Sequence, residues 1–190
     1  MSITKTPLQP GRTYHIYNKS LDARIVFRSE EHYKKMLQLM KKYMPAAYNV
    51  YAYCLLPNHF HFLICIKTDI IEKPHLPLGH MLNSYSQYFN KHQKRHGPLF
   101  QRPFKRKLIT NRQYLWQLVC YIHHNPFHHQ LSDYKSYAWS SYSAFRTSRQ
   151  TVLCREKVFD FFGGRKEFFS FHEDEAQYRG IRDSLLEYSK

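Results

Sequence analysis

The sequence predicts an α+β fold: a ferredoxin-like antiparallel sheet with packed helices, followed by a short helical C-terminal extension. Two observations predict this class. Segments with strand-like and helical patterns follow one another in the order β-α-β-β-α-β-α along most of the 190 residues. The second and third strands are separated only by a short turn, which makes them an antiparallel hairpin. A hydrophobic content of 43% is sufficient for a core around such a sheet.

The first strand and the first helix follow from alternation and capping. In residues 12–19, Tyr14 and Ile16 alternate with more polar neighbours, as in a half-buried strand. Ser29 is a suitable N-cap for a helix that ends just before Pro45. Apolar residues recur in that helix every three or four positions, which predicts one face in contact with the sheet.

The hairpin and the second helix come next along the chain. Residues 48–56 and 59–67 are rich in aromatic and aliphatic side chains and flank a Pro-Asn turn, so they are expected to pair. Residues 68–78 are expected to form a loop. A helix is expected from residue 78 to about residue 96, where a Gly-Pro pair ends it.

A fourth strand and a third helix complete the predicted sheet domain. The strand is expected over residues 104–109. Thr110 is expected to cap a helix that runs to Asn125, and Pro126 marks its boundary. Residues 127–150 are expected to be irregular or helical.

The expected organisation is a catalytic domain of residues 1–150 and a helical extension of residues 151–190. Helices are expected near residues 155–162 and 173–188, on either side of a Gly-Gly break. No run of 18 apolar residues predicts a membrane span, and the first residues lack the apolar core of a secretory signal. We therefore expect a cytoplasmic protein without a membrane partner.

Cysteine usage agrees with that compartment. Cys54, Cys65, Cys120 and Cys154 show no CxxC spacing, and each lies in apolar sequence. They are expected to be buried thiols in a reducing environment and neither zinc ligands nor disulfides.

The charge is concentrated in one part of the chain. The formal net charge is +15, from 29 Lys and Arg against 14 Asp and Glu. Residues 155–190 are nearly neutral, so the excess belongs to the first 154 residues, and residues 73–132 contain no carboxylate at all. Such a surface attracts polyanions and indicates a nucleic-acid partner, although a solvated basic face without a specific partner stays open.

A His-x-His pair follows the turn of the predicted hairpin. Side chains two apart in a strand share a face, so His59 and His61 point the same way while Phe60 and Phe62 point toward the core. Two aligned imidazoles can hold one divalent cation and leave other coordination positions open for substrate oxygens. The alternative is a pair of polar residues on the wet face of an edge strand.

The third predicted helix carries a possible nucleophile. Tyr121 and Asn125 are four residues apart, so a tyrosine hydroxyl and an amide oxygen lie one turn apart on one face. The amide oxygen can complete a cation site. A half-buried tyrosine whose hydroxyl meets water is the alternative. The lack of clustered carboxylates excludes nucleases that hold two cations with an acidic triad.

Four short motifs occur in order along the chain: Pro57-Asn58-His59-Phe60-His61, Gly97-Pro98-Leu99-Phe100-Gln101-Arg102, Tyr121-Ile122-His123-His124-Asn125-Pro126 and Trp139-Ser140-Ser141-Tyr142. Together they resemble the HUH single-tyrosine transposases, and within them the REP-associated tyrosine transposase branch. The resemblance covers about residues 12–147. Asparagine followed by proline after the tyrosine favours that branch over insertion-sequence members, which usually have glutamine there.

The resemblance implies a metal-dependent DNA endonuclease and strand transferase. His59, His61 and Asn125 would bind Mg²⁺ or Mn²⁺, which polarises the scissile phosphate. Tyr121 would attack the phosphorus of single-stranded or hairpin DNA and stay joined to the 5′ end, releasing a 3′-OH. Two other functions stay open: a domesticated, catalytically silent nucleic-acid-binding protein, and an RNA-processing nuclease on the same fold.

The basic residues of the central stretch are the expected DNA contacts. Aromatic residues interleaved with them, among them Phe100 and Phe104, can stack on unpaired bases or belong to the core. His15 and Lys19 on the first strand are weaker candidates. No protein partner is expected; the protein is a monomer or a homodimer, and the boundary expected at Pro126 favours a monomer. The expected phosphate contacts are Arg12, Lys91, Lys94, Arg95, Arg102, Lys105, Arg106 and Lys107.

Overall fold

The computed structural model describes residues 6–69 and 72–174 and has the predicted α+β fold class. Four strands form one antiparallel sheet in the ferredoxin-like order β2-β3-β1-β4, so β3 and β1 are central and β4 is an edge. The strands are β1 (Thr13–Lys19), β2 (Tyr48–Leu56), β3 (His59–Ile66) and β4 (Lys105–Ile109).

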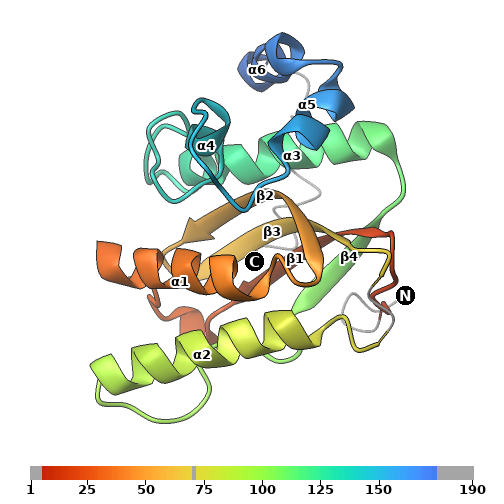
Figure 1. Ribbon diagram of the computed structural model, residues 1–190. Helices are drawn as coiled ribbons and strands as arrows, with labels where there is room; N and C mark the ends of the chain where they lie inside the picture. The colour runs from red at the N-terminus through yellow and green to blue at the C-terminus, as the bar shows by residue number, and fades with distance from the viewer. Residues whose placement is uncertain (1–5, 70–71, 175–190) are drawn as a thin grey trace.

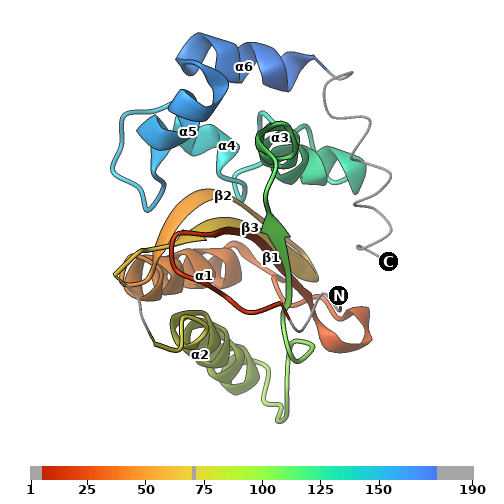
Figure 2. The ribbon, with the colours of Figure 1, turned by 90° about the vertical axis from the view of Figure 1, so that its right-hand side faces the viewer.

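Helices cover both faces of the sheet. Two of them lie on one face, α1 (Glu30–Tyr43) and α2 (Leu76–His92). The other face carries α3 (Arg112–His128), and α4 (Tyr142–Phe145), α5 (Arg155–Phe162) and α6 (Arg165–Glu173) lie on the same side (Figures 1 and 2). A short 3-10 helix, η1 (Leu21–Ala23), follows β1. No helix in the described ranges is long and apolar enough to cross a bilayer.

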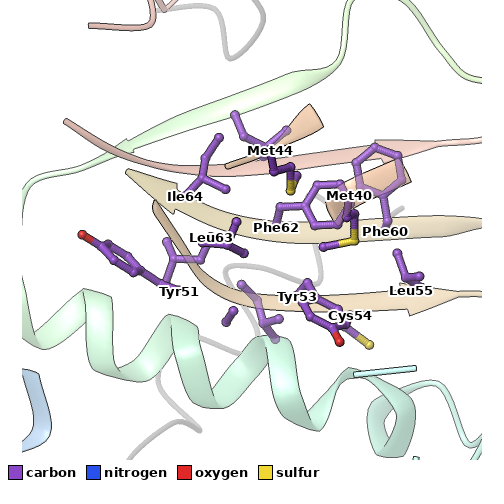
Figure 3. Packing of buried hydrophobic residues seen from close by; sticks show 14 of the residues in the cluster. Met40, Met44, Tyr51, Tyr53, Cys54, Leu55, Phe60, Phe62, Leu63 and Ile64 are labelled. Carbon is purple, nitrogen blue, oxygen red and sulfur yellow. The ribbon is translucent and has the colours of Figure 1, made fainter. Parts of the chain in front are cut away.

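Because the sheet lies between two helical layers, several polar side chains of its central strands are buried, among them His15, Asn18, His59 and His61. All eight residues of β3 are buried. Phe60 and Phe62 stack with ring centroids 4.6 Å apart, and they belong to a core cluster that includes Met40 of α1 and Met44, the residue after that helix (Figure 3). The alternate side chains of β3, beginning with His59, point to the opposite face, which α3 covers.

The expected boundary of the third helix at Pro126 is wrong. Asn111, and not Thr110, caps α3, since its side chain accepts a hydrogen bond from the backbone N–H of Tyr114 at 3.1 Å. The helix then continues through Pro126 to His128. A proline in the last turn removes only one backbone donor, and the fully buried surroundings of Asn125 favour continuation. Pro126 therefore gives no support for a monomer.

The other boundaries differ by a few residues. The second helix begins at Leu76, because Pro77 is compatible with a first helical turn, and it ends at His92. Ser29 precedes α1 as expected, but its hydroxyl pairs with Nδ1 of His32 and not with a backbone N–H.

The start of the predicted extension is bonded to the sheet. The backbone N–H of Cys154 donates to Val50 of β2 at 2.9 Å, and α5 begins at Arg155 as expected. Helix α6 was not expected. The polar helix predicted over residues 173–188 lies almost entirely outside the described residues. All four cysteines are free, and three of them are buried.

A buried chain of hydrogen bonds holds α3 between the sheet and α6. Nδ1 of His172 bonds to the Phe168 carbonyl at 2.7 Å, so its Nε2 accepts from Nδ1 of His123, also at 2.7 Å. Nε2 of His123 then accepts from the hydroxyl of Ser141 at 2.7 Å. The same hydroxyl accepts the backbone N–H of Tyr53 at 2.9 Å. Two motifs that are distant in sequence thus meet to position the helix that carries Tyr121.

This chain of histidines predicts destabilisation by acid. Burial lowers the pKa of His172 to about 3 and that of His123 well below its usual value. The unfolded chain binds a proton at each histidine below about pH 6.5 and the folded chain does not, so this stability is complete above pH 6.5 and falls as the pH drops. At pH 5 we expect each of the two histidines to lower the free energy of unfolding by about 2 kcal/mol, relative to its value above pH 6.5.

Urea unfolding at pH 7.5 and pH 5 measures this effect. His172→Gln keeps a side chain that can bond to His123 but removes one titrating group, so its stability should change less between the two pH values. An equal urea midpoint for the original chain at both pH values would contradict the assignment.

Candidate active site and nucleic-acid interface

The two histidines of the His-x-His pair lie under α3 on the central strand β3. They share one face of the sheet, as predicted, and their ring centroids are 5.3 Å apart. They do not lie on the wet face of an edge strand: His59 is 5% exposed and His61 is 2% exposed. Helix α3 covers this face of the sheet and thereby buries the two imidazoles.

One face of helix α3 packs against this histidine pair. The ring of Tyr121 meets His61 edge-on, with centroids 5.9 Å apart. Two turns further, the ring of His129, directly after the helix, packs edge-on against His59 at 4.8 Å. Asn125 lies midway between Tyr121 and His129 in sequence, and its Nδ2 donates to the Tyr121 carbonyl at 2.8 Å. Residues four apart on a helix share a face, so Asn125 faces β3 between the two contacts.

The three expected cation ligands each carry a buried atom that has no hydrogen-bond partner among the described residues. These atoms are Nε2 of His59, Nε2 of His61 and Oδ1 of Asn125. Nδ1 of His59 lies 2.7 Å from Oδ1 of Asn58. An amide oxygen can only accept, so Nδ1 carries the proton and Nε2 keeps its lone pair. Buried polar atoms are normally satisfied, so these three, on two facing elements, are available to bind a cation or a water molecule.

His61 is oriented by a third histidine. Its Nδ1 lies 2.9 Å from Nε2 of His15, which is on the neighbouring strand β1. A cation on Nε2 of His61 requires the proton on Nδ1, which then donates to His15; such outer hydrogen bonds orient metal-binding imidazoles. His15 is 2% exposed, and in this structure its ring contacts His61 and Tyr17.

The histidines of the site are neutral at neutral pH. Burial, with smaller contributions from His129 and Lys19, lowers the pKa of His59 to about 3. Burial also lowers the pKa of His61 well below its usual value and that of His15 to about 3. Only the neutral imidazole offers a lone pair that a metal ion can accept.

The donor set fits a divalent cation with open coordination positions. In the part of the chain that the structure describes, no three His, Cys, Asp or Glu side chains converge as a metal cluster. The candidate ligands are therefore His59, His61 and Asn125, with Nε2 of His129 as a further buried atom without a partner among the described residues, beside His59. Such a set leaves coordination positions open for substrate oxygens, so it does not make a closed structural zinc site.

The basic side chains near the site come from two strands. Lys19 of β1 lies opposite His59, and Lys105 and Lys107 of the edge strand β4 lie opposite Tyr17 and His15. Residues paired in this way share a face of the sheet, so these lysines lie on the face that carries the histidines. The strand alternates, which places Arg106 on the other face, over the ring of Phe104.

The remaining expected DNA contacts do not form one patch with the site. Lys91, Lys94 and Arg95 line a separate cavity of about 490 Å³ at the C-terminal end of α2. Arg102 is exposed in the segment before β4, and Arg12 precedes β1 at the end remote from His59. Tyr85 and Phe89 are fully buried, so these two aromatics belong to the core and do not stack on bases.

Sequence reasoning missed several site residues. The sequence pattern indicates His15 only as a DNA contact and gives no site role to Asn58 or His129. The adjacency of Asn58 to His59 was visible in the sequence. The contacts of His15 and His129 depend on strand register and on the angle of α3, for which local sequence carries no signal.

The fold and the site together define an α+β domain with a histidine pair on the sheet beneath a tyrosine-bearing helix. A similar solved structure is described as a REP-associated tyrosine transposase bound to a REP hairpin, with a TM-score of 0.57 and 15% sequence identity. The alignment covers 77% of this chain and 86% of that one. At this identity the likeness shows a shared fold. No family model matches the chain, and no curated protein matches it.

Proposed function

We propose that this protein is a transposase-like DNA endonuclease and strand transferase that acts on single-stranded or hairpin DNA through a tyrosine nucleophile. One observation carries the proposal: Tyr121 lies against His61 while Asn125, His59 and His61 hold three unsatisfied buried ligand atoms beside it. The shared fold with a transposase bound to a hairpin supports it.

The side chains divide the chemistry between them. His59, His61 and Asn125 would hold Mg²⁺ or Mn²⁺, which when bound supplies Lewis-acid polarisation of a phosphate oxygen. Tyr121 loses its hydroxyl proton and forms a bond from Oη to phosphorus. The bond from phosphorus to the 3′ oxygen breaks, and that oxygen leaves as a 3′-OH after taking up a proton. Lys19, Lys105 and Lys107 attract the flanking phosphates.

The covalent intermediate explains strand transfer. The phosphotyrosine bond keeps the free energy of the phosphodiester, so the 3′-OH of another strand can attack it and restore the Tyr121 hydroxyl. No water or nucleotide cofactor is consumed in that exchange.

A second function, DNA binding without cleavage, is favoured by one observation. Tyr121 is fully buried, so the groups that cover its hydroxyl must be displaced before a phosphate reaches it. A silent protein would keep this burial when DNA binds.

Formation of a covalent adduct tests the proposal. The protein is incubated with fluorescent DNA hairpins carrying randomised single-stranded flanks and Mn²⁺, and adducts are separated under denaturing conditions. We expect an adduct whose peptide map places the nucleotide on Tyr121. Tight binding without any adduct would favour the silent function, and matched RNA hairpins test the nuclease alternative.

Lys105 provides a prediction about affinity. Its Nζ lies 5.8 Å from the ring centroid of Tyr17, which stacks on His61. Removing one phosphate contact should weaken binding of every sequence and reduce the slope of log K against log salt by about 0.7–0.9. We expect this result for Lys105→Ala by fluorescence anisotropy across a salt series. Lys34→Ala, whose ammonium pairs with Glu30 on α1, should leave the slope unchanged.

A further inference from the structure

A cavity of about 530 Å³ lies at the β2 edge of the sheet, between the second half of α1 and the segment that runs from α4 to residue 152. Helix α1 lies on one side of β2, and α4 lies on the other (Figure 2). The volume is within the range of small-molecule sites. None of the residues assigned to the tyrosine site lines this cavity, and its apolar walls come from Leu37, Met40, Ala144 and Val152.

Hydrogen bonds fix the outer wall of this cavity. The guanidinium of Arg155, at the start of α5, donates to the carbonyl oxygen of Ala144 at 3.0 Å and to that of Thr147. At the other end of the wall, Leu153 forms a β-bridge with Val50 of β2. The segment is thus held against the edge strand before any ligand arrives, as in most small-molecule sites.

Tyr53 of β2 supplies a hydrogen-bond donor to the cavity. It lines the cavity and is only 8% exposed. Its backbone N–H and carbonyl both bond to Ser141, but its hydroxyl bonds to no residue in the described part of the chain. Burial raises the pKa of Tyr53 to about 12, so the hydroxyl keeps its proton. Because buried polar groups normally have partners, this hydroxyl is available to donate to a ligand.

The charge around the cavity selects an anion. Lys41 and Arg149 line it, and both side chains are exposed. No Asp or Glu occurs among the described residues that line it. Two cations without a carboxylate attract an anionic group, whereas the apolar walls accept an uncharged body. The thioether of Met40 favours an aromatic body, because sulfur makes favourable contacts with aromatic rings.

We propose that this cavity is a binding site for a small aromatic carboxylate whose body carries a hydrogen-bond acceptor. The ring packs against the apolar walls, the carboxylate pairs with Lys41 and Arg149, and the acceptor takes the hydrogen bond of the Tyr53 hydroxyl. The site needs neither DNA nor Tyr121, so it is independent of the proposed function.

Isothermal titration calorimetry of the full chain with 4-acetylbenzoate, in the absence of DNA, tests the charged part of the site. The double variant Lys41→Ala/Arg149→Ala should bind about fivefold more weakly, since exposed ion pairs contribute modestly. Lys42→Ala/Arg146→Ala is the matched control: both residues are exposed, neither lines the cavity, and the net charge changes equally. The control should bind like the original chain. The uncharged 4-acetylbenzamide should bind the original chain about fivefold more weakly than 4-acetylbenzoate does.

A second pair of titrations tests the hydroxyl. Tyr53→Phe keeps the ring and removes only the donor, so it should weaken 4-acetylbenzoate about fivefold. The same substitution should leave the affinity for 4-isopropylbenzoate unchanged, because that molecule has a similar shape but no acceptor in place of the acetyl oxygen. Absence of binding to the original chain would overturn the proposal, as would equal affinities for 4-acetylbenzoate in the Lys41/Arg149 variant and its control.

Discussion

Tyr121→Phe is expected to abolish the covalent protein–DNA adduct. The substitution removes only the hydroxyl oxygen and keeps the ring that packs against His61 and His128. No other group on phenylalanine can attack phosphorus, so the cleavage rate should fall by at least about 10⁴-fold, as when other enzymes lose a covalent nucleophile. Denaturing electrophoresis of fluorescent hairpin DNA with Mn²⁺ measures this loss, and anisotropy should show that binding is retained.

The control is another tyrosine of the same helix. Tyr114 lies seven residues before Tyr121, and its hydroxyl accepts a hydrogen bond from Lys107 at 2.9 Å. Tyr114→Phe should form adduct at close to the original rate. If the adduct persists at full yield in Tyr121→Phe, the nucleophile is a different residue and the assignment made here fails.

Loss of either histidine of the pair is expected to stop cleavage and leave DNA binding. His59→Ala and His61→Ala each remove one of the three unsatisfied ligand atoms. A Lewis-acid cation contributes several kcal/mol to phosphoryl transfer, so we expect a decrease of about 10³-fold or more in the cleavage rate. EDTA should have the same effect on the original chain, and added Mn²⁺ should reverse it there but not in the variants.

Metal binding can be followed without DNA. Electron paramagnetic resonance of free Mn²⁺ should show the signal decreasing when the original chain is added and staying unchanged with His61→Ala. His80→Ala, which replaces an exposed histidine on α2, should bind Mn²⁺ like the original chain. Full cleavage in EDTA, or a full rate in His61→Ala, would exclude the proposed cation site.

The strands of the sheet could be predicted well because their signals are local. The bounds of β2 matched residue for residue, and β3 ended one residue early, since alternation and a Pro-Asn turn depend only on neighbours in sequence. Helix ends were less predictable. Pro126 by itself indicates a helix boundary. The packing of the buried residues around it nevertheless keeps Pro126 within α3.

The layers on either side of the sheet were harder to foresee. The sequence predicts packed helices without saying which face each covers, and α3 to α6 lie on the face opposite α1 and α2 (Figure 2). The Trp139-Ser140-Ser141-Tyr142 motif was visible, but its role was not. The hydrogen bond between Ser141 and His123 forms only because the segment with Ser141 packs beside β2. His172 of α6, a helix that the sequence did not predict, forms a second hydrogen bond with His123.

The sequence by itself determined the pairs within one element. His59 and His61 share a face because strands repeat every two residues, and Tyr121 and Asn125 share a face because helices repeat every 3.6. Tertiary structure alone decided which of these faces meet. The placement of Tyr121 on His61, the hydrogen bond between His61 and His15, and the burial of the histidines and Tyr121 depend on strand register and helix packing. Those are set by long-range contacts in the core, which no local periodicity encodes.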